Sequence, residues 1–233
     1  TLVEQRKGLI NCARGLMRHF GHAVATGSAE RFVHRVEKHS LPEDLRALIQ
    51  PLLTSIACMD DQIAELERHL EAVAADYEVV QRLRAIDGVG LLVALSFVLC
   101  IDDPTRFKKA RDVGPYLGLR PRLWESGEVS RQGGISKEGD AEMRRLLVQA
   151  AHVMLHTCKQ DSELRRWGLR LQERQGPTIA AVGVARKLAV LMLHLWQTGA
   201  SYERFHLQGE TAAAAATDPA TDAVTDAVTP RTV

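Results

Sequence analysis

Apolar residues recur along most of the chain at the three- and four-residue steps of an amphipathic helix. This periodicity predicts helices over residues 1–20, 41–77, 112–119, 140–157, 162–174 and 178–198. Residues 79–101 predict two further short helices that flank Asp87-Gly88-Val89-Gly90. We therefore expect a mainly α fold: a coiled-coil helical arm, followed by a compact helical domain that contains a hairpin-helix-helix motif and an irregular or short β-hairpin loop.

The apolar residues within 41–77 form a heptad seam, because their spacing alternates between four and three. The seam residues are Leu45, Ile49, Leu52, Ile56, Met59, Ile63, Leu66, Leu70 and Val73. Isoleucine at one seam position and leucine at the other favour two parallel strands, and so a homo-oligomer formed through the coiled coil. An intramolecular hairpin with residues 1–20 fits the pattern equally. Pro51 lacks a backbone donor, so we expect a kink or break near Gln50.

Composition divides the chain into a helical coiled-coil linker over residues 1–78, a second helical domain over 79–208 and a tail over 209–233. The tail is rich in Ala and Thr and lacks large apolar residues, so we expect it to be disordered. The chain starts at Thr1 inside an amphipathic pattern, which predicts a truncated start.

Two features of the sequence predict a cytoplasmic protein. There is no run of about 18 apolar residues and no signal peptide, so neither a membrane span nor export is expected. The cysteines form no C-x-x-C pair and no zinc spacing, and we expect reduced, packed thiols. These residues are Cys12, Cys58, Cys100 and Cys158.

The net charge of +1 hides an uneven distribution. The tail from Gly209 sums to −3, which leaves +4 on the rest of the chain. Residues 106–145 alone hold ten Lys or Arg against six Asp or Glu. This concentration of positive charge favours a polyanionic partner, although a solvated charged face produces the same pattern.

Gly88 and Gly90 form the first candidate site, because a backbone without side chains can approach a phosphate closely. The helix that follows would present free N–H groups and the positive end of its dipole, and Ala94 would let the two helices pack. Such a module holds a nucleic-acid backbone without reading its sequence. An ordinary corner between helices is the second interpretation. A dinucleotide-binding turn is the third, but it lacks a third glycine and a preceding strand.

The second candidate site is the glycine-rich serine loop over residues 120–140. A serine hydroxyl attacks only when a base or metal activates it, and arginines can hold a phosphate and stabilise its developing charge. The cationic flank of the candidate Ser126 consists of Arg120, Arg122 and Arg131. A polar β-turn is the simpler interpretation of these residues alone. Nothing local separates Ser126 from Ser130 or Ser136, and Ser136 is also a candidate cap for the following helix.

His152 and His156 form the third candidate, since histidines four apart share a helix face and can bind metal. The glutamate of a metalloprotease motif is absent, so we expect two packed or half-exposed histidines and predict no metal site.

An ordered set of motifs spans residues 83–151. In chain order they read GVG, RF, YLGLRPR, ESG, GGISKEG and RRLL. Together they resemble the C-terminal domain of the insertion-sequence 110/116/902 family of DNA transposases. The resemblance covers residues 80–200 closely and continues more weakly toward Thr1.

The resemblance implies a recombinase that moves a mobile element. In this family an N-terminal ribonuclease H-like domain with four carboxylates holds magnesium, and a coiled coil links it to the C-terminal domain and helps the protein dimerise. The C-terminal domain supplies a serine that forms a covalent 5′-phosphoserine link to DNA, and this serine carries over to Ser126. DNA is therefore the expected partner, with a structured guide RNA from the element as a further one.

On this interpretation Ser126 attacks a DNA phosphate, and charged and glycine residues position it. The expected nucleic-acid contacts are Gly88, Gly90, Arg120, Arg122, Arg131, Lys137, Arg144 and Arg145. The four-carboxylate domain is missing, and Gly114-Pro115 departs from the family pattern. We therefore expect no cofactor bound by this chain, magnesium in the absent N-terminal domain, and little or no cutting by the chain alone. The alternatives are a non-catalytic nucleic-acid-binding module and an inactive truncated transposase.

Overall fold

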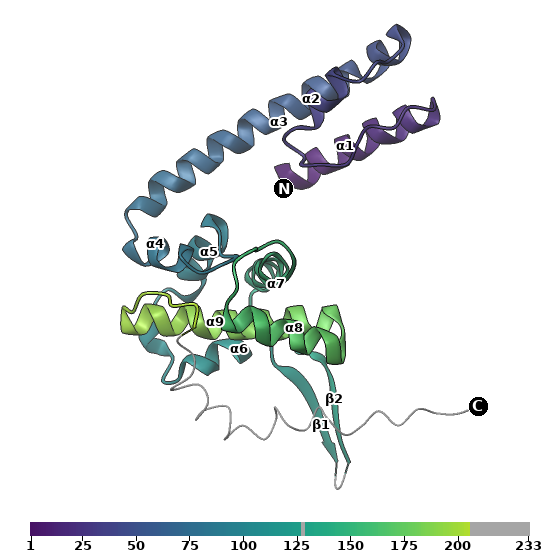
Figure 1. The fold of residues 1–233 in the computed structure, drawn as a ribbon. Helices are drawn as coiled ribbons and strands as arrows, with labels where there is room; N and C mark the ends of the chain where they lie inside the picture. Colours follow the sequence, from purple (N-terminus) through teal and green to yellow (C-terminus); the bar gives the residue numbers. More distant parts are fainter. Residues whose placement is uncertain (127–128, 206–233) are drawn as a thin grey trace, which may run out of the picture. The chain divides into compact units, whose positions relative to one another are not determined.

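The computed structural model describes residues 1–126 and 129–205, and for residues 123–132 only their backbone. The chain divides into two compact units, Thr1–Val73 (unit 1) and Ala74–Val233 (unit 2), where the sequence predicted a boundary after residue 78. Helices make up most of both units, and a two-stranded sheet lies in unit 2 (Figure 1). The prediction of a mainly α fold is therefore confirmed. The predicted disorder of the tail falls outside the described residues.

Unit 1 is built from α1 (Leu2–His19), α2 (Phe32–Glu37) and most of α3 (Glu43–Ala75). A capping box begins α1, in which the Thr1 hydroxyl accepts from the Glu4 N–H and the Glu4 carboxylate accepts from the Thr1 amino group. The three helices share one buried core. Its members are Ile10, Ala13, Met17, Phe32, Val36, Leu45, Ile49, Leu53 and Ile56. The first half of the heptad seam is thus occupied by the chain itself.

The second half of the seam lies beyond this core. Leu66 is 51% exposed and Val73 is 49% exposed. A buried ion pair marks the end of the covered part, where Arg6 Nη1 on α1 lies 2.6 Å from Asp60 Oδ1 on α3. The intramolecular interpretation therefore holds for the first half, and pairing with a second copy stays a prediction for the second.

Two local predictions for this region need correction. The sequence predicted a kink or break near Gln50, and a break is wrong because α3 continues through Pro51, while a kink stays a prediction. The hydroxyls of Thr54 and Ser55 donate to the carbonyls of Gln50 and Pro51, at 3.1 and 2.9 Å. The second correction is α2, which the sequence analysis missed. A helix of six residues offers a single apolar pair, Phe32 and Val36, and so too little periodicity to detect.

Unit 2 packs its helices around α9. The elements are α4 (Glu78–Arg84), α5 (Leu91–Ile101), α6 (Val113–Tyr116), α7 (Ala141–His156), α8 (Glu163–Gln175) and α9 (Pro177–Thr198), with 3₁₀ turns η1 (Pro104–Arg106) and η2 (Ala110–Asp112). Helices α4, α6, α7 and α8 and both 3₁₀ turns contact α9, and α5 packs against α4 and α7. The buried core includes Leu83, Phe97, Ile101, Leu117, Leu147, Met154, Val184, Leu188 and Met192.

Helix α9 is long and apolar enough to cross a membrane, by length and composition alone. Half of its most apolar window is buried inside the protein. Its buried residues, which include Val184 and Leu188, pack against α7 and α8, as expected of the core helix of a folded domain.

The predicted helix over 112–119 is only half as long in the structure. Only Val113–Tyr116 is α-helical, and Gly118 follows with a φ of +68°. A left-handed residue ends the helix, and the Leu119 N–H then donates to the Gly114 carbonyl at 2.9 Å. The apolar spacing that predicted a longer helix, at Val113 and Leu117, instead buries both side chains around this turn.

The serine loop forms a β-hairpin. Strands β1 (Pro121–Ser126) and β2 (Val129–Ile135) are antiparallel, with Ser126 opposite Val129 and an irregular register between Pro121 and Leu123. Figure 1 shows the two strands leading away from the helices of unit 2. Ser126 is the last residue of its strand and therefore lies at the far end of the hairpin.

Candidate nucleic-acid interface

The base of the hairpin is held by close contact between two backbone segments. The Ser136 N–H donates to the Arg120 carbonyl at 2.8 Å, and the Lys137 N–H donates to the Gly118 carbonyl at 3.1 Å. Gly118 and Gly139 both have positive φ, and a Cβ on either would collide with a backbone carbonyl of the opposite segment. The glycines of the YLGLRPR and SKEG motifs therefore join the two ends of the hairpin.

Four of the cationic residues predicted to contact nucleic acid lie at this base, but only some of them are free to bind a ligand. They are Arg120, Arg122, Lys137 and Arg144. Arg144 is half-buried, and its Nη1 donates to the carbonyls of Leu117 and Glu138 at 3.0 and 3.3 Å. Arg122 Nη2 donates to the Ser136 carbonyl at 2.9 Å. Within the described part of the chain, the exposed side chains of Arg120 and Lys137 have no hydrogen-bonding partner. Arg144 thus stabilises the fold, while Arg120 and Lys137 are available to a ligand.

Arg145 lies on the exposed side of α7 and is paired with an acid. Its guanidinium binds the Glu142 carboxylate and also donates to Gln149 Oε1 at 3.4 Å. The hydrogen bond from Arg145 lowers the pKa of Glu142 below its ordinary value. A phosphate at Arg145 would therefore compete with this carboxylate.

The serine nucleophile is placed by its backbone only. Ser126 pairs with Val129, and Arg131 pairs with Trp124 across the hairpin. The side chains of Ser126, Ser130 and Arg131 lie outside the described residues. Ser136 does not cap the following helix. Its hydroxyl accepts from the Glu138 N–H at 3.4 Å, and Asp140 caps α7.

The two glycines of the GVG motif have different surroundings. Gly88 has a φ of +84°, and a Cβ there would lie 2.8 Å from the Ala150 carbonyl oxygen on α7. The close approach that this glycine permits is therefore to a helix of the same unit. Gly90 is exposed, has open space where a Cβ would lie, and precedes α5 without a side-chain cap. The first-turn N–H groups of α5 follow Gly90 directly and have no side-chain cap, so they stay the candidate anion contact of this motif.

The structure does not bring Ser126 close to the GVG motif. The hairpin base lies beside the start of α7, whereas Gly88 contacts Ala150 and Met154. Nine residues of helix separate Ala141 from Ala150, which is about 13 Å at the usual rise. The hairpin adds about 16 Å between Pro121 and Ser126, directed away from the helices in Figure 1. One nucleic-acid strand would have to extend over this distance to contact both.

The comparison with known families identifies the chain. The family model of the transposase IS116/IS110/IS902 family matches residues 80–166. The transposase for insertion sequence element IS1111A of Coxiella burnetii is 34% identical over 198 residues, which cover 82% of this chain and 54% of that protein. The transposase for IS1328 of Yersinia enterocolitica is 34% identical over 81% of this chain and 58% of its own length. The chain belongs to the IS116/IS110/IS902 transposase family.

The family match covers the GVG loop, the hairpin and α7 together. A probable family 20 transposase of Pseudomonas aeruginosa is 31% identical over 82% of this chain and 59% of its own length. The chain thus spans just over half the length of the curated transposases that it matches. The family resemblance predicted from the motifs is confirmed.

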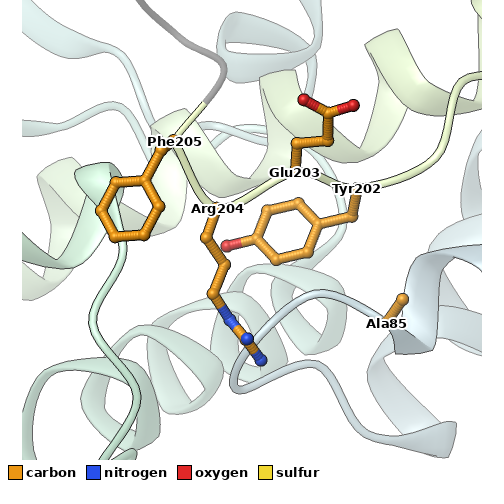
Figure 2. Close-up of a pocket in the computed structure, with 5 residues that line it drawn as sticks. All are labelled: Ala85, Tyr202, Glu203, Arg204 and Phe205. Atoms are coloured by element: carbon orange, nitrogen blue, oxygen red, sulfur yellow. The ribbon is translucent and has the colours of Figure 1, made fainter.

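One contact of this transposase chain was missed by the sequence analysis, namely an ion pair that ties the GVG loop to the segment after α9. Arg204 Nε and Nη2 lie 2.9 and 3.0 Å from the two carboxylate oxygens of Asp87, and the Tyr202 hydroxyl donates to Asp87 at 3.4 Å. Figure 2 shows Arg204 extending toward the loop and Glu203 pointing the other way. The partners are 117 residues apart, so no spacing in the sequence indicates the pair.

This ion pair shifts the pKa of its neighbours. The hydrogen bond to Asp87 raises the pKa of Arg204 above its ordinary value. Burial and the nearby Asp87 charge raise the pKa of the Tyr202 hydroxyl. Both residues line a pocket with Ala85, Glu203 and Phe205 (Figure 2).

The remaining candidates from the sequence are the histidine pair and the cysteines. His152 and His156 are exposed, and their rings stack at 5.9 Å. The described residues contain no group of three or more His, Cys, Asp or Glu side chains that could hold a metal ion. All four cysteines are free thiols, but Cys12 and Cys58 are exposed rather than packed as expected.

Proposed function

We propose that this chain is the C-terminal portion of a DNA transposase, that it binds DNA, and that it takes part in strand exchange through Ser126. Family membership supports the class of activity. The observation that supports the residue is the position of Ser126 at the end of β1, beyond a rigid base that carries Arg120 and Lys137. A terminal position on a projecting hairpin is accessible to a large substrate.

The proposed reaction is a phosphoryl transfer. Ser126 Oγ attacks the phosphorus of a DNA phosphodiester and loses its proton to a base, so that a bond forms between Oγ and phosphorus. The bond from phosphorus to the 3′ oxygen breaks, and that oxygen leaves as a hydroxyl. The product is a 5′-phosphoserine, from which a second DNA hydroxyl can later displace the serine. Arg120, Arg122 and Lys137 would neutralise the phosphates next to the reacting one.

The chain supplies only part of this chemistry. Activating a serine hydroxyl requires a base or a metal ion, and the described residues offer no metal-binding cluster. Curated relatives contain about as much chain again outside the matched region. We propose that the carboxylates that hold magnesium belong to that other part, so this chain alone cuts poorly or not at all.

The helical arm is proposed to pair two copies of the chain. The seam residues that unit 1 does not cover include Leu66 and Val73, both half-exposed. Two exposed leucine-type seams can bury each other in a parallel coiled coil. A guide RNA, the remaining predicted partner, would bind to the same cationic surface as DNA, since both present a phosphate backbone.

The test is a covalent trap. The full chain is incubated with Mg²⁺ and with the N-terminal half of a full-length family transposase supplied as a separate protein, because this chain alone is proposed to cut poorly or not at all. The substrate is DNA from the region that flanks the reading frame of the chain, with a 3′-bridging phosphorothiolate at the scissile position. A sulfur leaving group departs without acid assistance and does not return, so an adduct accumulates. We expect a denaturation-resistant protein–DNA band for the wild type and for Ser130→Ala, and none for Ser126→Ala, with non-covalent binding unchanged in all three.

The same experiment separates the second candidate function, a nucleic-acid-binding module without catalysis. That candidate is favoured by the exposed side chains of Arg120 and Lys137, which can hold phosphates at the hairpin base without any chemistry. It predicts binding by all three proteins and an adduct in none. An adduct that persists in Ser126→Ala would instead refute the assignment of the nucleophile.

A further inference from the structure

The loop between α5 and α6 carries a concentration of positive charge that the fold does not use. Residues 104–111 read PTRFKKAR, with four cations and no acid. Lys108, Lys109 and Arg111 are exposed, and none has a hydrogen-bonding or ionic partner among the described residues. Arg106 is the exception, because its Nη1 donates to the Ile101 carbonyl at 3.3 Å. Asp103 and Asp112 flank the segment, but within the described part of the chain neither forms an ion pair with these three cations, which are therefore open to an anionic ligand.

The loop is nevertheless held in one conformation. Gln197 on α9 donates from its side-chain amide to the carbonyls of Pro104 and Phe107, at 2.8 and 2.9 Å. Asp103 accepts from the Thr105 N–H at 2.8 Å and so begins the 3₁₀ turn η1. A loop that is ordered before binding loses little entropy on binding, and this favours affinity.

An aromatic side chain lies beside these cations. Tyr116 is 39% exposed, and its ring meets the edge of Phe107 at 5.3 Å. The Arg106 guanidinium lies over the Tyr116 ring at 5.7 Å. An exposed tyrosine and a planar guanidinium together provide a surface on which a base can stack.

This surface joins the hairpin base. A Cβ on Gly139 would collide with the Tyr116 carbonyl oxygen, so the α6 turn and the SKEG segment are in backbone contact. Arg120 and Lys137, the available cations of the base, therefore lie on segments in backbone contact with the α6 turn, which carries Tyr116.

We propose that the basic loop Arg106–Arg111, together with Tyr116, binds a single nucleic-acid strand, with phosphates on Lys108, Lys109 and Arg111 and one base stacked on Arg106 and Tyr116. The inference rests on the proposed function and adds residues that neither the candidate nucleophile nor the GVG motif includes. An acidic peptide could pair with the cations, but it carries no base that could stack on Tyr116 and Arg106. A duplex keeps its bases stacked on each other, so a single strand fits better.

The first test measures binding of a fluorescent thymidine 20-mer to the full chain by anisotropy over a range of salt concentrations. We expect Lys108→Ala/Lys109→Ala to bind about tenfold more weakly at low salt, with the slope of log K against log salt reduced by about 1.4, or about 0.7 for each lost phosphate contact. The control is Arg170→Ala/Arg174→Ala, which removes two exposed cations from α8 and should bind like the wild type. Equal losses in both variants would overturn the proposal.

The second test examines stacking. Tyr116→Phe keeps the ring and should bind like the wild type, whereas Tyr116→Leu should bind about fivefold or more weakly. Thermal melts show whether the leucine variant is folded, and equal binding by the two variants would contradict stacking. Competition by poly-glutamate as strong as that by the unlabelled 20-mer would instead identify an acidic protein partner and overturn the proposal.

The outcomes for the inference and for the proposed function are separate. If Lys108→Ala/Lys109→Ala binds like the wild type while the Ser126-dependent adduct forms, the inference fails and the proposed function stands. If the loop variant loses binding but no adduct forms in any protein, the inference stands and the catalytic assignment fails. A wild-type chain that binds no oligonucleotide refutes both.

Discussion

Replacing Arg204 by alanine should destabilise unit 2, because it leaves the buried Asp87 carboxylate without its cation, and an unpaired buried polar group costs about 1–3 kcal/mol. The guanidinium makes two hydrogen bonds to the Asp87 carboxylate, at 2.9 and 3.0 Å. Arg204 is 41% exposed, so water replaces part of what is lost. The Asp87 side chain is only 8% exposed, and its charge would remain with the Tyr202 hydroxyl at 3.4 Å.

Substituting Asp87 should destabilise unit 2 less than substituting Arg204. Asp87→Asn keeps the shape of the side chain, and the released guanidinium can turn to water and still donate to Gln160. Its expected cost is about 1 kcal/mol. Because the larger penalty comes from a buried carboxylate without its cation, Asp87→Asn should rescue part of the loss in Arg204→Ala. A coupling energy of about 1–2 kcal/mol is expected from the double-mutant cycle.

Urea unfolding followed by tryptophan fluorescence measures these energies in unit 2 alone. All three tryptophans, Trp124, Trp167 and Trp196, lie in that unit. The matched control is Arg166→Ala, which removes an exposed ion pair with Asp161 and should cost less than about 1 kcal/mol. The reasoning is refuted if Arg204→Ala costs no more than this control, or if Asp87→Asn is as damaging as Arg204→Ala.

Two further predictions concern unit 1. The backbone N–H of Glu30, and then the Arg6 guanidinium, lower the pKa of Glu30 below its ordinary value of 4.5. The contribution of Glu30 to stability is therefore present above pH 4.5 and lost as the pH falls through the lower folded-state pKa. Glu30→Gln should flatten that acid-side loss in circular dichroism titrations, and an unchanged titration would contradict it. For the proposed pairing of copies, Leu66→Asp should shift the chain toward monomer in light scattering. Leu48→Asp, equally exposed at 51% but outside the seam, should leave the mass unchanged.

Periodicity predicted the long helices well because each one buries a stripe over several turns. Helix α7 buries Met143, Leu147 and Met154 on one face, and the sequence predicted this helix over residues 140–157. Apolar periodicity failed to predict the correct helix where only one or two apolar residues defined the pattern. At Val113 and Leu117 the same spacing belongs to a short helix that Gly118 ends in the left-handed region.

Glycine and arginine showed where contacts are close but not what is contacted. Gly88 was expected to admit a phosphate, yet the group that approaches it is the Ala150 carbonyl of α7. Arg144 was expected to bind phosphate, and it donates instead to the carbonyls of Leu117 and Glu138. Glycine allows a backbone carbonyl to approach as closely as a phosphate, and the guanidinium group of arginine donates to either. The sequence alone therefore cannot distinguish a contact within the fold from a contact with nucleic acid.

In unit 2 the residues proposed to bind nucleic acid lie apart from Ser126, the proposed nucleophile. The basic loop is fixed by Gln197, and the hairpin base is fixed by backbone contacts at Gly118 and Gly139, so both can bind phosphate without rearranging. Ser126 lies about 16 Å from that base, at the end of two strands. Its alignment with a phosphate therefore depends on how the hairpin meets the DNA, and not on the GVG loop, which lies beside Ala150 and Met154 of α7. A defect confined to Gly90 should accordingly weaken affinity while leaving the chemistry of bound DNA intact.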